Sequence, residues 1–242
     1  MMISEFGHGG LGKVQATAII PAGGSGRRMG GTEAKQYLLL QGIPLLVHTL
    51  RVFQEAAVIG EIILAVPAAD VDRIRREILD PFRLTKVRHV VAGGRQRQDS
   101  VHNGIAALAD DCELVVIHDA ARPFVTPDLI ARAVEGAAQY GAVAAGIPAR
   151  DTIKYCDAAG RVARTLPRER IWIVQTPQAF RRETIVAAHR QARRDNFSGT
   201  DDAALVERLG VAVRMIVGES ENIKITTPDD LVWAEHILSA QR

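Results

Sequence analysis

Short apolar runs alternate with segments of helical periodicity from Ala16 onward, and this alternation constrains the fold more than any other feature of the sequence. It is typical of βα units, whose strands form a mostly parallel sheet with helices on both faces. The expected strands are Ala16–Ile20, Glu61–Val66, Val87–Ala92, Glu113–Ile117 and Ala142–Ile147. The sequence therefore predicts an α/β fold with a doubly wound, Rossmann-like sheet.

Residues that favour helix ends lie between these strands. Pro127 suits the first turn of a helix that has Thr126 as its N-cap and Gly141 just after its end, and Asp99 or Ser100 can cap another helix. The expected helices are Pro44–Ala56, Asp70–Leu79, Asp99–Leu108, Pro127–Tyr140, Glu183–Arg194, Asp201–Leu209 and Pro228–Leu238, with further strands at Val211–Val217 and Ile223–Thr226.

The alternation is interrupted at about residues 150–180. Thr152–Tyr155 and Val162–Leu166 flank the turn-forming run Asp157–Gly160, which predicts a β-hairpin that leaves the sheet. A hairpin alone is marginally stable in water, so we expect this arm to pair with the same arm of a second subunit in a homodimer.

Length and charge limit the class of protein. A chain of 242 residues with 47% hydrophobic composition can form one large domain, expected over residues 14–242 after a disordered leader at 1–13. The net charge of +2 is far below that of proteins that coat nucleic acid, so no nucleic-acid partner is expected. The sequence has no apolar run of about 18 residues and no signal-peptide pattern, which predicts a cytoplasmic protein without a membrane span.

A glycine-rich loop from Pro21 to Lys35 directly follows the first strand. Glycines let backbone N–H groups approach phosphate oxygens, and the loop's arginines and lysine supply the charge that a triphosphate requires. The predicted contacts are Pro21, Ala22, Gly23, Gly24 and Gly26, with Arg28 and Lys35 as the cations. The loop lacks the Gly-Lys-Ser/Thr of a P-loop and the last glycine of a dinucleotide fingerprint. The alternative is a mobile surface loop with incidental arginines.

Asp119 follows the apolar run Leu114–Ile117, so it should emerge at the same sheet edge as the loop. Mg²⁺ binds one or two carboxylates together with substrate phosphate oxygens, which makes Asp119 the candidate ligand. Arg122 would face an anionic second substrate. The alternative is that Asp119 caps a turn and Arg122 forms a surface ion pair.

Three other polar segments give weaker signals. Gly93–Ser100 follows a strand and opens a helix, so Gly94, Arg95 and Ser100 could contact a base, although a helix-capping turn explains them equally well. Thr200 precedes a helix start and could hold a phosphate, while Lys224 is by default an exposed strand residue.

Seven ordered segments together make the chain similar to the 2-C-methyl-D-erythritol 4-phosphate cytidylyltransferase family. They are PAGGSGRRMGGTEAKQY (21–37), GGRQRQDSV (93–101), HDAARPFV (118–125), RDTIK (150–154), WIVQTPQAF (172–180), TDDAALVERLG (200–210) and ENIKITTPDDL (221–231). Two positions depart from the family's usual pattern, because Gly23 stands where alanine is frequent and Arg95 where an acid is frequent.

The resemblance implies a Rossmann-like nucleotidyltransferase fold and attack by methylerythritol phosphate on the α-phosphorus of CTP. It implies that Arg28, Lys35 and Lys224 stabilise the transition state and that Asp119 holds Mg²⁺ or another divalent cation, with Glu221 as a weaker candidate for the metal shell. The nucleotide contacts would be the loop residues with Gly94, Arg95, Ser100, Asp119 and Ala120. The sugar phosphate would be bound by Arg122, Thr176, Thr200 and Lys224, and by Thr152 and Arg168 from the partner's arm.

Two alternatives remain at this point. A cytidylyltransferase for another polyol phosphate, such as ribitol 5-phosphate, would share the loop and the aspartate after the fourth strand. A nucleotide-sensing module would bind CTP without releasing pyrophosphate.

Overall fold

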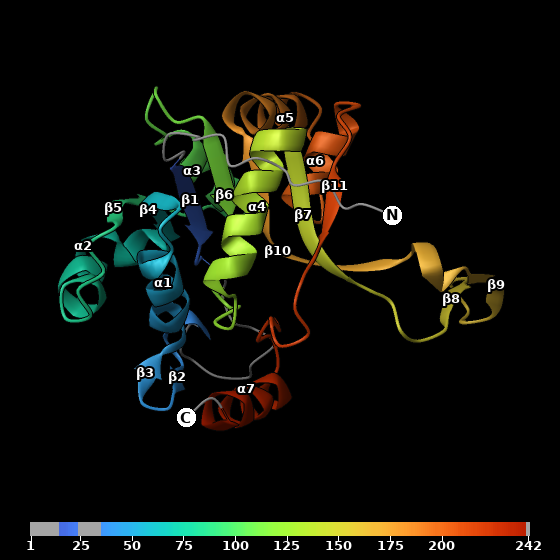
Figure 1. Ribbon diagram of the computed structural model, residues 1–242, viewed down its shortest axis with the longest axis horizontal. Helices are drawn as coiled ribbons and strands as arrows, with labels where there is room; N and C mark the ends of the chain where they lie inside the picture. The colour runs from blue at the N-terminus through green and yellow to red at the C-terminus, as the bar shows by residue number, and fades with distance from the viewer. Residues whose placement is uncertain (1–14, 24–34, 241–242) are drawn as a thin grey trace, which may run out of the picture.

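The computed structural model describes residues 15–23 and 35–240, with the side chain of Lys35 outside the described part. The predictions for the leader 1–13 and for Gly24, Gly26 and Arg28 also lie outside the described residues. A seven-stranded sheet in the order β11-β7-β10-β6-β1-β4-β5 forms the centre of the fold (Figure 1). Its strands are β1 (Ala16–Pro21), β4 (Ile59–Val66), β5 (Val87–Ala92), β6 (Leu114–Ile117), β7 (Ala142–Pro148), β10 (Trp172–Arg181) and β11 (Arg214–Val217).

The sheet is mostly parallel, as the sequence predicts. β1 pairs in parallel with both β4 and β6, and β4 with β5, while β11 pairs in parallel with β7. Within the described residues, β10 is the only antiparallel strand of this sheet and lies between β6 and β7. The chain fills the sheet outward from β1 to β5 and then returns to the other side of β1 with β6, which creates a topological switch point.

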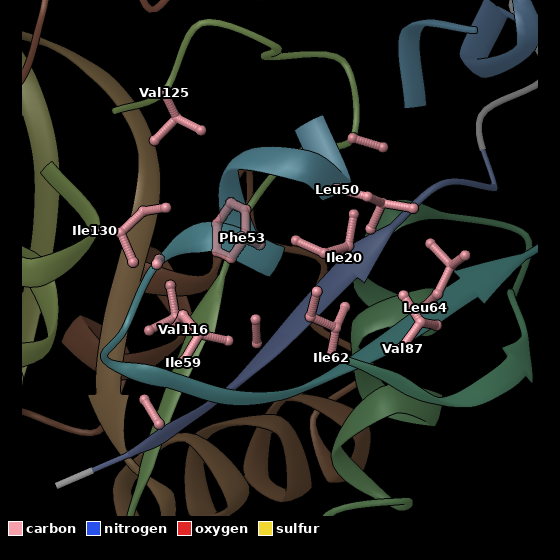
Figure 2. Close-up of a cluster of buried hydrophobic side chains, with 14 of the residues drawn as sticks. Ile20, Leu50, Phe53, Ile59, Ile62, Leu64, Val87, Val116, Val125 and Ile130 are labelled. Carbon is pink, nitrogen blue, oxygen red and sulfur yellow. The ribbon is translucent and has the colours of Figure 1, made fainter. Parts of the chain in front are cut away.

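Helices cover both faces of the sheet, which confirms the doubly wound architecture. One face carries α1 (Leu45–Glu55), α4 (Pro127–Tyr140) and the short α2 (Val71–Ile74), and its core includes Phe53 of α1 and Ile130 of α4 (Figure 2). The other face carries α3 (Arg97–Ile105), α5 (Arg182–Arg194) and α6 (Asp202–Arg208). Successive β1 side chains serve the two cores, with Ile20 in the first and Ile19 in the second.

A smaller third layer closes the end of the molecule near α7 (Pro228–Ala240). The hairpin of β2 (Leu39–Leu40) and β3 (Ile43–Pro44) contacts this helix, where Gln41 N–H donates to Glu235 Oε1 at 3.0 Å. Ile225 and Ala234 belong to the buried cluster beneath α7. No helix in the described part of the chain combines the length and the apolar composition needed to cross a membrane.

Most helix boundaries agree with the sequence, including the Thr126 cap, whose Oγ1 accepts the Leu129 N–H at 3.1 Å. The cap of α3 was predicted wrongly, because Gln96 is the N-cap and its own N–H donates to Asp99 Oδ2 at 3.1 Å. The predicted helix Asp70–Leu79 is α2 followed by a π-helical turn at Arg75–Leu79. The predicted strand Ile223–Thr226 is also wrong, because this segment is irregular and the Ile225 N–H bonds Ala121 O.

The predicted hairpin is present as β8 (Ile153–Cys156) and β9 (Val162–Leu166), a separate two-stranded sheet. It projects well away from the central sheet (Figure 1). Gly160 closes its turn with φ +78°, a conformation that favours glycine. The 150–180 segment does not stay outside the sheet throughout, because its last part enters β10.

Candidate active site

The carboxyl ends of β1 and β6 meet at the switch point, where open α/β sheets bind ligands. Pro21 ends β1, and the buried Ala22 donates its N–H to Ala65 O at 2.7 Å. Gly23 follows beside Ser100 of α3, so that a Cβ on Gly23 would lie 3.3 Å from Ser100 Oγ. The loop leaves the sheet here in close contact with the start of α3.

Ser100 is buried, and its hydroxyl organises the turn before α3. Its Oγ accepts the Gly94 N–H at 3.1 Å and donates to Gln96 O at 3.2 Å. Gly93 packs so closely that a Cβ there would lie 3.0 Å from the same Oγ and 3.3 Å from Val66 O. The predicted nucleotide contacts Gly23, Gly94 and Ser100 therefore lie together, whereas Arg95 is exposed.

Asp119 follows β6, and its carboxylate is surrounded by cationic side chains. Its Oδ1 lies 2.6 Å from Arg97 Nε, and its Oδ2 lies 2.7 Å from Lys224 Nζ. Arg122 Nε lies 3.7 Å from the same Oδ2. Only 9% of the Asp119 side chain is exposed, so this charge could not remain buried without its partners. This buried cluster disagrees with the alternative in which Asp119 only caps a turn and Arg122 forms a surface ion pair.

The burial and the neighbouring charges determine the protonation state of the Asp119 carboxyl. Burial by itself raises the pKa of this carboxyl, but the charges of Arg97 and Lys224 outweigh burial and hold the pKa well below its usual range. Burial also lowers the pKa of the Arg122 guanidinium, with Asp119 acting against it. Asp119 is therefore an anion throughout the physiological range.

Arg97 is the first residue of α3 and bridges two acids. Besides Asp119, its Nη1 lies 2.7 Å from Asp202 Oδ2. Asp202 is 1% exposed, and its other oxygen Oδ1 lies 3.1 Å from His189 Nε2. Burial raises the pKa of the Asp202 carboxyl, but Arg97 and His189 together lower it below its usual value. Arg97 thus joins the end of β6 to the start of α6.

His118 and Thr176 form a buried hydrogen-bond chain behind Asp119. Burial lowers the pKa of His118 to about 4, so the imidazole is neutral. Its Nε2 lies 3.1 Å from the Arg122 carbonyl, which can only accept, so Nε2 carries the proton. The bare Nδ1 accordingly accepts from the Thr176 hydroxyl at 3.0 Å, and the Thr176 Oγ1 accepts the Asp119 N–H at 3.1 Å.

A cavity of about 240 Å³ brings five of the predicted residues together. It is lined by the predicted residues Asp119, Arg122, Thr176, Thr200 and Lys224, and by Arg97, Val174, Gln175, Gln178 and Asp201, which were not predicted. Lys224 was expected as an exposed strand residue, but it lies in an irregular segment and is only 36% exposed in its side chain. The cavity combines three cationic side chains with the carboxylates of Asp119 and Asp201, a suitable environment for phosphate and a divalent cation.

The structure places the remaining predicted residues elsewhere. Ala120 is buried behind the cavity, where its carbonyl accepts the Thr49 hydroxyl at 2.8 Å. Glu221 is exposed and does not line the cavity. Thr152 and Arg168 belong to the projecting arm, and Arg168 Nη1 donates to Arg150 O at 2.9 Å. No group of three or more His, Cys, Asp and Glu side chains in the described ranges could hold a metal by itself.

Residues 16–240 match the family model described as IspD: 2-C-methyl-D-erythritol 4-phosphate cytidylyltransferase. The chain is 50% identical over 229 residues to the 2-C-methyl-D-erythritol 4-phosphate cytidylyltransferase of Syntrophus aciditrophicus, covering 95% of this chain and 98% of that protein. It is 47% identical to the enzyme of the same name from Geotalea uraniireducens, covering 94% and 98%.

Solved structures give the same result for the fold. The crystal structure of 4-diphosphocytidyl-2C-methyl-D-erythritol synthase from Anaerococcus prevotii superposes with a TM-score of 0.83 at 34% identity, covering 95% of this chain and 97% of that one. The 2-C-methyl-D-erythritol 4-phosphate cytidylyltransferase from Thermus thermophilus gives a TM-score of 0.76 at 34% identity, covering 93% and 99%.

Proposed function

The chain belongs to the 2-C-methyl-D-erythritol 4-phosphate cytidylyltransferase family, and we propose that it transfers the cytidylyl group of CTP to 2-C-methyl-D-erythritol 4-phosphate in isoprenoid precursor synthesis. The products are 4-diphosphocytidyl-2-C-methyl-D-erythritol and pyrophosphate. The observation that supports this activity best is the cavity at the switch point, where Arg97, Arg122 and Lys224 surround Asp119. The CTP-facing side is the turn where Gly23, Gly94 and Ser100 meet.

The reaction joins an oxygen of the acceptor phosphate to the α-phosphorus of CTP and breaks the bond from that phosphorus to the bridging oxygen of pyrophosphate. The attacking oxygen is already ionised, so the site needs no general base. Catalysis then depends on in-line placement of the two substrates and on neutralising charge at the phosphorus. Lys224 supplies one such charge, and Arg28 and Lys35 of the glycine-rich loop are proposed to supply the others.

The acceptor phosphate is proposed to bind Arg122, Thr200 and Lys224, because these side chains line the cavity together. Thr176 takes a narrower part than the sequence resemblance suggests. Its hydroxyl uses its one hydrogen to donate a hydrogen bond to His118. Thr176 can therefore accept a hydrogen bond from a substrate hydroxyl but cannot donate one to the phosphate.

A divalent cation such as Mg²⁺ fits the residues present. Asp119 offers hard carboxylate oxygens at a phosphate-binding cavity, and Mg²⁺ commonly takes one carboxylate, substrate phosphates and water. Its chemistry there is to offset the charge of the triphosphate and the departing pyrophosphate. Lys224 occupies Oδ2 of Asp119, so this ammonium would share or release that oxygen when the cation binds.

The projecting hairpin supports a proposal of a homodimer whose arms reach the partner's site. Thr152 directly precedes β8 and Arg168 follows β9, and neither lines the cavity of its own chain. The exposed apolar side chains Tyr155 and Val162, 56% and 59% exposed, give the hairpin a surface that a second copy could cover. In the proposed assembly each cavity is completed by Thr152 and Arg168 of the partner subunit.

Pyrophosphate release from CTP tests the activity with each acceptor in turn. We expect turnover with 2-C-methyl-D-erythritol 4-phosphate, and little with ribitol 5-phosphate at equal concentration. Turnover with ribitol 5-phosphate alone would replace the proposed acceptor. CTP binding without pyrophosphate release, under conditions where a cation is supplied, would instead support a nucleotide sensor.

A further inference from the structure

Arg97 occupies a position in the cavity that neither its sequence motif nor the proposed reaction explains. Its side chain is 26% exposed, and its guanidinium bonds the carboxylates of Asp119 and Asp202, whose side chains are 9% and 1% exposed. Its third nitrogen, Nη2, is buried and lacks a hydrogen-bond partner among the described residues. Both carboxylates therefore hold this arginine, and its guanidinium cannot move toward solvent without breaking the ion pairs with both acids.

The anchor of Arg97 is built rigidly. Asp202 bonds Arg97 through Oδ2 and His189 through Oδ1, so neither carboxylate oxygen is free to turn. The Asp202 N–H donates to Gln178 Oε1 at 3.2 Å, which ties the start of α6 to β10. An arginine fork held in this way fixes the carboxylate on its other side.

The two oxygens of Asp119 consequently differ in their partners. Oδ1 is held by the anchored Arg97 at 2.6 Å, whereas Oδ2 is held by Lys224 at 2.7 Å and lies 3.7 Å from Arg122 Nε. Lys224 comes from an irregular segment and carries the more exposed of the two cationic side chains. Oδ2 is thus the oxygen that can exchange its partner when phosphate or a cation arrives.

We infer that Arg97 is a positioning residue that, anchored through Asp202, holds Asp119 with Oδ2 presented to the substrates. This rests on the proposed function only in naming the substrates. Arg97 acts through Asp119 and contacts no reacting atom. Asp202 acts through Arg97, so removing Asp202 should matter only while Arg97 is present.

The test compares Arg97→Met, Arg97→Lys, Asp202→Asn and the double variant Arg97→Met/Asp202→Asn. Arg208→Met is the matched control, because Arg208 pairs with Asp195 at 2.9 Å at the other end of α6, outside the cavity. Each protein is assayed for kcat and for KM of CTP. In parallel, electron paramagnetic resonance measures the Kd of Mn²⁺ in the presence of a CTP analogue that cannot be cleaved between the α- and β-phosphorus.

Arg97→Met should lower kcat and raise the Mn²⁺ Kd about 10- to 100-fold, as expected for loss of a group that orients a metal ligand, with KM changed much less. Arg97→Lys should lower kcat and raise the Mn²⁺ Kd nearly as much, because an ammonium cannot bridge both acids as the guanidinium does. The kcat of the double variant should be no lower than that of Arg97→Met, even if the double variant has a higher melting temperature than Arg97→Met. Arg208→Met should match the wild type.

Wild-type kcat and Mn²⁺ affinity in folded Arg97→Lys or in the double variant would overturn the inference, and so would additive losses in the double variant. If Arg97→Met fails to fold, Arg97→Lys and the double variant still test the inference. Absence of pyrophosphate release from the wild type would contradict the proposed function, while the Mn²⁺ Kd would still report on Arg97.

Discussion

The hydroxyl of Thr176 donates to Nδ1 of the neutral His118 at 3.0 Å while it accepts the backbone N–H of Asp119 at 3.1 Å. This relationship fixes the backbone from which the central carboxylate projects. Both side chains are buried, His118 completely and Thr176 to 4% exposure, so water cannot replace either bond without a rearrangement.

Thr176→Val should therefore destabilise the fold. Valine has nearly the shape of threonine but leaves the Asp119 N–H and His118 Nδ1 without partners, at about 1–3 kcal/mol for each buried group. Thr176→Ser keeps the hydroxyl and should lose much less. Urea denaturation of both variants measures the difference, and equal unfolding free energies would show that the hydroxyl contributes nothing.

Lys224→Met should lower kcat about 100-fold, in the range found for loss of one group that stabilises transition-state charge. KM for CTP should change only a few-fold, because the proposed role of Lys224 is greatest when charge develops at the phosphorus. Asp119 keeps Arg97 and Arg122 as partners, so the melting temperature should change little.

Lys86→Met is the control for removing a lysine with one short contact. Its Nζ donates to Ala56 O at 2.8 Å just before β5, at the edge of the sheet opposite the cavity. Its kcat should equal that of the wild type. An unchanged kcat with a raised KM in Lys224→Met would show that Lys224 only binds substrate.

The parallel strands β1, β4, β6 and β7 were predictable because most of their residues are buried and they appear as apolar runs of strand length. β10 was not predicted as a strand of the sheet. Pro177 lies inside it, and proline within a run argues against a central strand. The buried polar residues Gln175, Thr176 and Gln178 also interrupt its apolar pattern. These side chains are polar because they line the cavity.

Some residues of the candidate site could be predicted from the local sequence pattern, and others could not. Asp119 and Arg122 could be placed because they follow a buried strand, and Thr200 and Lys224 were found through family resemblance. The Arg97–Asp202 pair joins residues 105 positions apart, and only the packing of α3 near α6 brings them together. Its one local signal was the capping pattern from Gln96 to Asp99, which places Arg97 at the first helical position.

Asp230→Asn should destabilise the turn that follows Lys224. Asp230 Oδ2 accepts the Thr226 N–H at 2.7 Å and the Thr227 N–H at 2.8 Å at the start of α7. Partial burial raises the pKa of the Asp230 carboxyl, but the Thr226 hydrogen bonds lower it below its usual value. The loss at pH 7 should be about 1 kcal/mol, typical of a helix-capping side chain.

The sign of the pH dependence follows from the lowered pKa. The folded state binds a proton at Asp230 less readily than the unfolded state, so the carboxylate stabilises the fold above about pH 4. That contribution is lost as pH falls through the folded-state pKa. The stability gap between wild type and Asp230→Asn should thus narrow at pH 3. Asp229→Asn, an exposed neighbour in the same turn, is the control, and a gap that stays constant with pH would contradict the assignment.

Mixing two inactive variants tests whether the arm serves the partner's cavity. Arg168→Ala should remove an arm contact with the acceptor, and Lys35→Ala should remove a loop cation, so each homodimer should lose most activity. In a hybrid dimer, one of the two cavities receives an intact loop from one chain and an intact arm from the other. When the two variants are mixed and allowed to exchange subunits, pyrophosphate release should recover toward a quarter of the wild-type rate, because half of the dimers are hybrids and each has one complete cavity.

Size-exclusion chromatography with light scattering checks that all samples are dimers. Activity that stays at the level of the separate variants, in samples shown to exchange subunits, would mean that the arm acts on its own chain or that Arg168 does not contact the acceptor.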